Sequence, residues 1–297
     1  MAVVALVAAS CSNESDVQVV ENTIENNALV PVTVRVDGFS VSQEDFSGGA
    51  TTRAAQAAGD YSGVKSLTLA FYASNGTEAY KVSQLKGSLE EGETFGEFSL
   101  SLPMGSYTMV VLGHGLNDGE PAVTLTGPTS ATFGEYPARE TFAYTQAVNI
   151  SNTDAVVLNA TLSRIVSKLQ VASSDVRTTD AYSVRMTFAA GSKSFNPTTG
   201  LATSDTGFSN TVTISTAVGN TTLSNSYLFL NTDEQTMNVT IETLDADGAV
   251  LFSKTVENVP FQRNRVTKLT GAMYTNSSVS GAFQLETAWI DQYEDTF

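Results

Sequence analysis

The sequence predicts an all-β protein built as two β-sandwiches in series, and three observations lead to this fold class. Thr, Ser, Val, Asn and Gly are abundant, whereas the helix-favouring residues Lys, Glu and Arg are sparse. Short segments of alternating apolar and polar residues recur along the chain between turn signals. The chain of 297 residues is long enough for two domains, and its hydrophobic content of 41% can supply their cores.

The charge balance limits the partners of the protein. With 31 acidic and 15 basic residues, the formal net charge is −16. A general nucleic-acid binder needs Lys and Arg to neutralise phosphates, so we exclude that class. The acidity also opposes a flat contact with anionic lipid, and it is typical of a soluble, exposed surface protein.

The N-terminus has the pattern of a bacterial lipoprotein signal. A short apolar run leads through Ser10 to Cys11, the only cysteine of the chain. The run is far too short to span a bilayer, and no Lys or Arg precedes it, so we expect the true start codon to lie upstream. This pattern predicts a signal peptide over 1–10, a lipid on Cys11 that holds the protein at the outer membrane, and a polar tether over 11–29. A buried or incidental free cysteine is the alternative.

The first expected strand follows the tether. The segment 30–36 alternates apolar with polar residues, which predicts a half-buried strand. Its apolar face consists of Val30, Val32, Val34 and Val36. A polar stretch rich in Gly, Ser and Ala then runs over 37–63 and contains Arg53. A loop of this length inside a compact domain is unusual, and we expect it to be functional or mobile.

Further strands complete the predicted first domain, which extends over 30–160. A tight hairpin turn is expected at Asn75-Gly76. A loop rich in Gly, Pro and Asn is expected from His114 to about Pro137. The expected strands lie at 64–72, 95–102, 106–113 and 155–158.

The predicted second domain extends over 161–297, and it too consists of short strands. It opens over 162–171, where a short helix is the alternative because the apolar residues also fit a 3.6-residue period. The clearest hairpin joins 237–244 to 249–256. The remaining strands are expected at 183–190, 211–215, 227–230, 265–274 and 281–290. Strands at this spacing predict two β-sandwiches in series, and the fold class that we expect for both is transthyretin-like or Greek-key.

Several segments, taken in order, resemble FimA-type fimbrillins, the subunits of type V pili in Bacteroidales. The N-terminal part of the match consists of Cys11, the strand 32–36, the loop end Thr52-Arg53-Ala54 and the strand 64–72. The later islands are 162–169, 260–271 and 283–289. Each island is weak alone, and the resemblance depends on their order together with the cysteine.

The resemblance implies a route of assembly. Subunits of this family reach the surface as lipoproteins, and an arginine-specific protease then removes the lipid together with the first strand. Cys11 falls at the lipidation position, and Arg53, followed by Ala54, falls at the cleavage position. A strand of the neighbouring subunit fills the vacated groove. The product would be a fimbrium that serves adhesion.

Elementary physics is consistent with this route. Removal of 30–36 would leave unpaired backbone groups beside an apolar trough, and such an edge recruits another strand. The candidate donor is the C-terminal end over 281–297. Its apolar residues are Phe283, Leu285, Trp289 and Ile290. The contact would be head-to-tail and non-closing, so it would propagate into a fibre of these subunits.

Plainer alternatives stay open at each point. Arg53 is alternatively a solvated loop residue, and the strand over 281–290 is alternatively an ordinary core strand of its own domain. An uncut chain would keep its lipid and act as the anchor subunit of a pilus. A surface glycan-binding lipoprotein is a further alternative, although the only Trp, Trp289, lies in a strand that we expect to be buried.

Patterns for catalysis and metal binding are weak. His114 is the only histidine, so it cannot form a His-rich zinc site, and we expect it to be a turn residue. A Ser-His-Asp triad through it has no nucleophile-elbow motif in its support. The segment 245–248 hints at a calcium loop, but Val256 stands where the bidentate Glu belongs, so we expect a hairpin turn. We therefore expect a protein that is not an enzyme and has no cofactor or metal.

Overall fold

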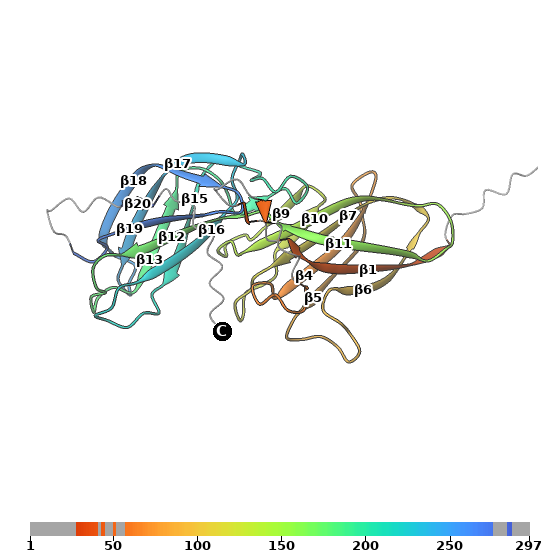
Figure 1. The fold of residues 1–297 in the computed structure, drawn as a ribbon, viewed down its shortest axis with the longest axis horizontal. Helices are drawn as coiled ribbons and strands as arrows, with labels where there is room; N and C mark the ends of the chain where they lie inside the picture. The colour runs from red at the N-terminus through yellow and green to blue at the C-terminus, as the bar shows by residue number, and fades with distance from the viewer. Residues whose placement is uncertain (1–27, 41–42, 45–49, 52–56, 276–283, 287–297) are drawn as a thin grey trace, which may run out of the picture.

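The computed structural model describes residues 28–40, 43–44, 50–51, 57–275 and 284–286, and the regular elements in this part of the chain are all β-strands. Figure 1 shows two groups of strands that lie one after the other along the long axis of the molecule. The predicted all-β fold is confirmed. Nowhere in these described stretches is there a helix with the length and apolar character that a membrane crossing requires.

The first group is a seven-stranded sheet with the order β5-β4-β7-β10-β11-β1-β6. In chain order its strands are β1 (Leu29–Ser40), β4 (Ser66–Ala73), β5 (Glu78–Leu85), β6 (Glu97–Pro103), β7 (Gly105–His114), β10 (Thr141–Ile150) and β11 (Val156–Arg164). β10 and β11 share only the pairs Phe142 with Arg164 and Ala143 with Ser163. Because this joint is so short, the sheet folds over into two layers.

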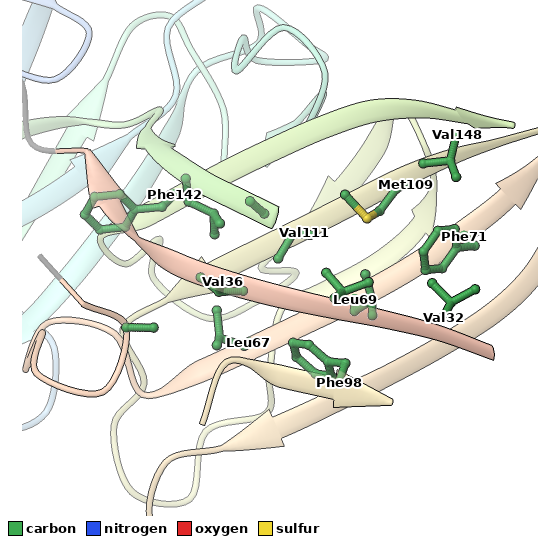
Figure 2. Packing of buried hydrophobic residues seen from close by; sticks show 14 of the residues in the cluster. Val32, Val36, Leu67, Leu69, Phe71, Phe98, Met109, Val111, Phe142 and Val148 are labelled. Carbon is green, nitrogen blue, oxygen red and sulfur yellow. The ribbon is translucent and has the colours of Figure 1, made fainter. Parts of the chain in front are cut away.

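A core, which we call the first core, fills the space between these layers (Figure 2). One wall consists of β4, β7 and β10, and the other consists of β1, β6 and β11. Val32 of β1 lies near Phe71 of β4, and Phe98 of β6 closes the lower side of the same space. The alternation of apolar and polar residues in these strands explains the arrangement, since every second side chain faces inward.

The second group consists of two four-stranded sheets, ordered β16-β12-β19-β20 and β15-β13-β17-β18. Its strands are β12 (Ser167–Ser173), β13 (Ser183–Phe188), β15 (Phe208–Thr213), β16 (Leu223–Leu228), β17 (Glu234–Leu244), β18 (Val250–Gln262), β19 (Val266–Gly271) and β20 (Gln284–Glu286). A second core of buried residues, among them Leu169, Met186 and Ile241, lies between the two sheets.

The turn between β17 and β18 has the form that its sequence predicts. The Oδ1 atom of Asp245 accepts hydrogen bonds from the backbone N–H groups of Asp247 and Ala249, at 3.0 and 2.8 Å. Gly248 has φ of +83°, a conformation that glycine adopts without strain. The expected hairpin turn is therefore confirmed.

A third apolar cluster joins the two groups of strands. A small sheet combines β8 (Thr124–Gly127) and β9 (Ser130–Thr132) with β14 (Ser194–Phe195) from the later half of the chain. The rings of Phe195 and Phe229 stack with their centroids 4.0 Å apart. Val110 and Leu112, on the outer face of β7, are buried in the same cluster. The remaining pair of strands, β2 (Gln43–Glu44) and β3 (Ala50–Thr51), forms a separate two-stranded sheet.

The structure differs from the sequence expectations in several elements. Strand β10 was not expected, and the loop expected from His114 to Pro137 contains the strands β8 and β9. The single strand or helix expected over 162–171 is instead two strands, β11 and β12. They separate at Ile165 and Val166, whose side chains are buried in the third cluster. The division into two domains between 160 and 161 stays a prediction, and that position lies inside β11.

Candidate functional site

The strand expected over 30–36 is present as β1, and its inward face is deeply buried. Its five inward side chains are at most 7% exposed: Val30, Val32, Val34, Val36 and Phe39. Arg35, between two of them, is exposed on the other face. The predicted half-buried strand is thus confirmed. At roughly 1.5–3 kcal/mol for each buried apolar side chain, β1 supplies a large share of the energy of the first core.

β1 is hydrogen-bonded along both of its edges. It runs parallel to β11 and antiparallel to β6. The N–H group of Val36 extends the second ladder, since it donates to the carbonyl oxygen of Gly96 at 2.8 Å. In the part of the chain that the structure describes, β6 pairs with no strand except β1. β1 is therefore the strand through which β6 is connected to the sheet.

The end of β1 places Phe39 in an aromatic pocket, which we call the Phe39 slot. The ring centroid of Phe39 lies 4.9 Å from that of Phe142 and 5.3 Å from that of Tyr61. Gly113 of β7 makes room for the ring, because a Cβ atom at that position would lie 2.9 Å from the Phe39 ring and 3.1 Å from Leu67. The slot is therefore shaped for a large, flat side chain.

In the neighbouring part of the groove, the backbone of Gly96 packs closely against Val36 and Ala58. Gly96 has φ of +93°, and a Cβ atom on Gly96 would lie 3.3 Å from the Cβ of Val36 and 3.1 Å from the Cβ of Ala58. Glycine is required there both for its backbone conformation and for this close approach.

Sequence reasoning missed Phe39 because the strand is irregular at that point. Val36 lies opposite Ala160, but Gly38 lies opposite Thr161, so Asp37 is an extra residue in the ladder. This β-bulge moves Phe39 out of the two-residue alternation that identifies the four valines. The only available signal was a large aromatic residue shortly after an alternating run.

A partly buried ion pair closes the Phe39 slot. The guanidinium of Arg164 lies 5.0 Å above the centroid of the Phe142 ring, and its Nη2 lies 2.6 Å from Oε1 of Glu140. Its Nη1 donates to Oδ1 of Asn264, in the turn between β18 and β19, at 2.8 Å. Burial lowers the pKa of Arg164, but the charge of Glu140 and the hydroxyl of Tyr61 outweigh it and raise that pKa. Arg164 thus links the slot to the second group of strands.

The outward face of β1 carries an exposed ion pair. The Nε atom of Arg35 lies 2.8 Å from Oε1 of Glu97 on β6, and the side chains are 54% and 47% exposed. Such pairs contribute less than about 1 kcal/mol because water and salt screen them. The pair nevertheless marks the register, since Arg35 and Glu97 are direct cross-strand partners.

Several residues singled out in the sequence lie outside the described residues. They are Cys11, Arg53, Ala54, Phe283, Trp289 and Ile290. Leu285 lies in β20, which pairs with β19 over three residues, with Leu285 opposite Leu269. Lipidation at Cys11, cleavage after Arg53 and donation of the C-terminal segment therefore stay predictions.

His114 is not a turn residue, and this expectation was wrong. It is the last residue of β7 and is fully buried. Its Nδ1 lies 2.7 Å from the carbonyl oxygen of Gly115, and its Nε2 accepts the N–H of Val123 at 3.1 Å. These partners place the single ring proton on Nδ1. Burial lowers the pKa of His114, against the smaller opposing effects of Gly115 and Glu120.

The side chain of His114 therefore has a structural role in this fold. Its ring contacts the edge of Phe133, with the centroids 5.6 Å apart, in the third cluster. Among the residues that the structure describes, no three His, Cys, Asp or Glu side chains gather in a way that could hold a metal ion.

Comparisons with known proteins give structural neighbours of low similarity. The chain is similar to a candidate adhesin from Bacteroides ovatus, with 13% identity and a TM-score of 0.49 over 90% of this chain and 96% of that chain. It is similar to the fimbrial anchor protein Mfa2 from Porphyromonas gingivalis, with 13% identity and a TM-score of 0.47 over 87% and 96%. A candidate polysaccharide-binding protein from Bacteroides thetaiotaomicron has 10% identity and a TM-score of 0.45 over 82% and 92%.

Because these scores lie below 0.5, we draw neither fold nor function from the neighbours. No curated protein sequence matches the chain. One family model does match, and it covers residues 32–294. It is not a model of FimA-type fimbrillins, so that resemblance stays a hypothesis. The chain belongs to the family of unknown function DUF6562.

Proposed function

We propose that this protein is a structural subunit of a surface fimbrium that serves adhesion. In this proposal the precursor is a lipoprotein held at the outer membrane through Cys11. An arginine-specific protease then cuts after Arg53, which releases β1, and the strand of a neighbouring subunit takes its place. The proposal rests chiefly on one observation: β1 is an interior strand of the sheet and lies just before the connection that contains Arg53.

The energetics of the vacated groove support this proposal. Loss of β1 would leave backbone groups unpaired on both β6 and β11, and it would open five apolar sites to water. Unpaired edges beside apolar surface recruit a further strand. An incoming strand regains the ladder bonds on both sides together with the burial of four or five side chains, at roughly 1.5–3 kcal/mol each. Such docking would be tight and slow to reverse.

The second candidate is an anchor subunit that keeps its lipid and its first strand. The observation that favours it is the closed state of the sheet, because β1 fills its own groove and leaves no site for a neighbour's strand. The two candidates share the fold and differ only in cleavage after Arg53.

The test uses the soluble chain with Cys11→Ser, treated with an arginine-specific protease. We expect a new N-terminus at Ala54 and oligomers that resist heating in detergent, seen by gel electrophoresis and by size exclusion. The matched control is Arg53→Gln, which should stay uncut and monomeric. A chain that is cut at Arg53 and remains a monomer contradicts strand exchange. A chain isolated from cells with an intact lipid on Cys11 would favour the anchor role.

A further inference from the structure

A pocket lies where the two groups of strands meet, at the turn between β18 and β19. Three parts of the chain line it: 163–165 at the end of β11, Asp233 before β17, and 262–265 in the turn itself. Its volume of about 360 Å³ is within the range of ligand-binding clefts. We call it the arginine pocket, and we propose that it binds the acidic C-terminal segment 287–297 of the same chain. This docking does not depend on strand exchange.

The sign of the charge in the arginine pocket is opposite to that of the whole chain. Arg164, Arg263 and Arg265 line it, and Asp233 is the one acidic residue among its lining residues. The chain as a whole has 31 acidic and only 15 basic residues, so its composition does not account for three arginines in one small pocket. Guanidinium groups bind carboxylates through charge-assisted hydrogen bonds. An acidic segment is therefore the occupant that the pocket favours.

Arg263 is held in position at the wall of the pocket. Its Nη2 lies 2.8 Å from Oδ1 of Asp233, and its Nη1 donates to the carbonyl oxygen of Thr199 at 2.7 Å. Gly200 makes room for the guanidinium, because a Cβ atom at that position would lie 2.8 Å from Nη1. A guanidinium has five N–H donors, so these two contacts leave it able to bind a further carboxylate.

The direction of β20 leads the end of the chain to this pocket. β20 is antiparallel to β19, with Gln284 opposite Thr270 and Glu286 opposite Lys268. The residues after Glu286 therefore continue toward the start of β19, where the turn with Arg263 lies. The same ladder, continued by five residues, would bring Asp291 opposite Arg263 after a path of about 17 Å.

The edge of β19 offers backbone groups for this continuation. The N–H of Lys168 donates to the carbonyl oxygen of Arg265, so Arg265 faces the parallel neighbour β12. Backbone direction alternates along a strand, so the N–H and carbonyl groups of Val266 face the opposite edge, on which β20 lies. In the continued ladder Ala288 is the residue that meets them.

The segment 287–297 has the composition that the pocket requires. It contains Asp291, Glu294 and Asp295 and has no Lys or Arg. Trp289 would stand opposite Arg265, where an indole ring and a guanidinium attract each other. Charge, direction and reach thus agree on one occupant, the end of this chain.

The fluorescence of Trp289, the only tryptophan, reports the docking directly. In the uncut, soluble chain with Cys11→Ser, we expect Trp289 to be shielded from acrylamide. Arg263→Glu should raise the quenching constant severalfold, toward its value in urea. The matched control is Lys254→Glu, the same change of charge at an exposed site of β18, and it should leave the quenching unchanged. In 1 M salt, where the Debye length is about 3 Å, the original chain should also lose part of its shielding.

Variants of the segment itself complete the test. Asp291→Arg alone should expose Trp289, and combining it with Arg263→Glu should restore the shielding, because the pair is then reversed in sign. Urea unfolding followed by circular dichroism checks that each variant folds. Equal quenching in the original chain, Arg263→Glu and Asp291→Arg would overturn the proposal. Shielding that disappears on dilution would place the segment on a second copy and would overturn docking within one chain.

Discussion

The two terminal strands that the structure describes are placed in opposite ways. β1 lies in the interior of its sheet, with β11 on one side and β6 on the other, over 12 residues. β20 lies at the edge of its sheet, beside β19 alone, over three residues. Release of β20 would free one edge of β19. Release of β1 would disconnect β6 and open the first core, so the structural cost of removing the two ends differs greatly.

This contrast shows where a chain can exchange a segment and hold the replacement firmly. An edge strand is easily released and weakly replaced, because only one ladder is regained. An interior strand is released only when it is cut away, and its replacement regains two ladders and a row of buried side chains. In the proposed assembly, the interior position of β1 is therefore what makes its sheet the acceptor.

The largest expected effect comes from a charge placed in the inward face of β1. Val34→Asp buries a carboxylate without a partner, and we expect it to lower the free energy of unfolding by more than about 4 kcal/mol. Val157→Asp is the matched control on the neighbouring strand β11. Its site is 58% exposed, so it should change stability by at most about 0.5 kcal/mol. Urea unfolding followed by circular dichroism measures both free energies of unfolding. Equal losses in the two variants would contradict the contrast between the buried face of β1 and the exposed site on β11.

The link between the two groups of strands gives the next effect. Arg164→Ala removes a partly buried partner of Glu140 and the bond to Asn264, while the Tyr61 hydroxyl still donates to Glu140, and we expect a loss of about 1.5–3 kcal/mol. Arg35→Ala breaks an exposed pair and should cost less than about 1 kcal/mol. In calorimetry, we also expect the two groups of strands of Arg164→Ala to unfold in two separate transitions. A single, unshifted transition would show that the third cluster alone couples them.

The shape of the Phe39 slot gives a smaller effect with a clear rescue. Gly113→Ala would place a methyl group 2.9 Å from the Phe39 ring, and we expect it to cost about 1–3 kcal/mol. Adding Phe39→Leu to that variant should recover part of the loss. Gly127→Ala has no atom within 4 Å of the new Cβ and should be near neutral. If both glycine variants behave alike in urea unfolding, the slot is not tightly packed.

The smallest expected effect is a pH dependence through His114. Burial holds the folded-state pKa of His114 below the ordinary histidine value of about 6.5, so the unfolded chain binds the proton more readily. The stabilisation by neutral His114 is therefore complete above about pH 6.5 and is lost progressively as the pH falls below that value. His114→Gln should flatten this part of the stability curve. An unchanged curve in urea unfolding between pH 4 and 8, about the titration range of histidine, would contradict the assignment.

The sequence predicted strands whose alternation is regular and missed those whose signals conflict. The four valines of β1 and the turn at Asp245 follow simple rules of period and turn chemistry, and both are confirmed. The sequence predicted one element where the structure has β11 and β12. The reason is that two large apolar residues, Ile165 and Val166, occupy the break between the strands, where Gly or Pro would normally indicate a turn. Tertiary burial in the third cluster decides that point.

The partners of β1 could not be predicted from sequence. β6 is separated from it by 62 residues at the pair Arg35 and Glu97, and β11 by more than a hundred. Periodicity shows which face of a strand is buried, but it does not show which strands lie on either side. The Phe39 slot was missed for a related reason, since Gly113 and Tyr61 meet Phe39 only in the folded chain.

The double pairing of β1 has a mechanical consequence. A pull on Leu29 along the axis of the strand loads the ladders to β6 and β11 together, in shear, so the bonds share the force. A strand attached along one edge and peeled from its end instead breaks one bond at a time. The same groove, whichever strand occupies it, therefore forms a joint that resists tension far better than it resists peeling.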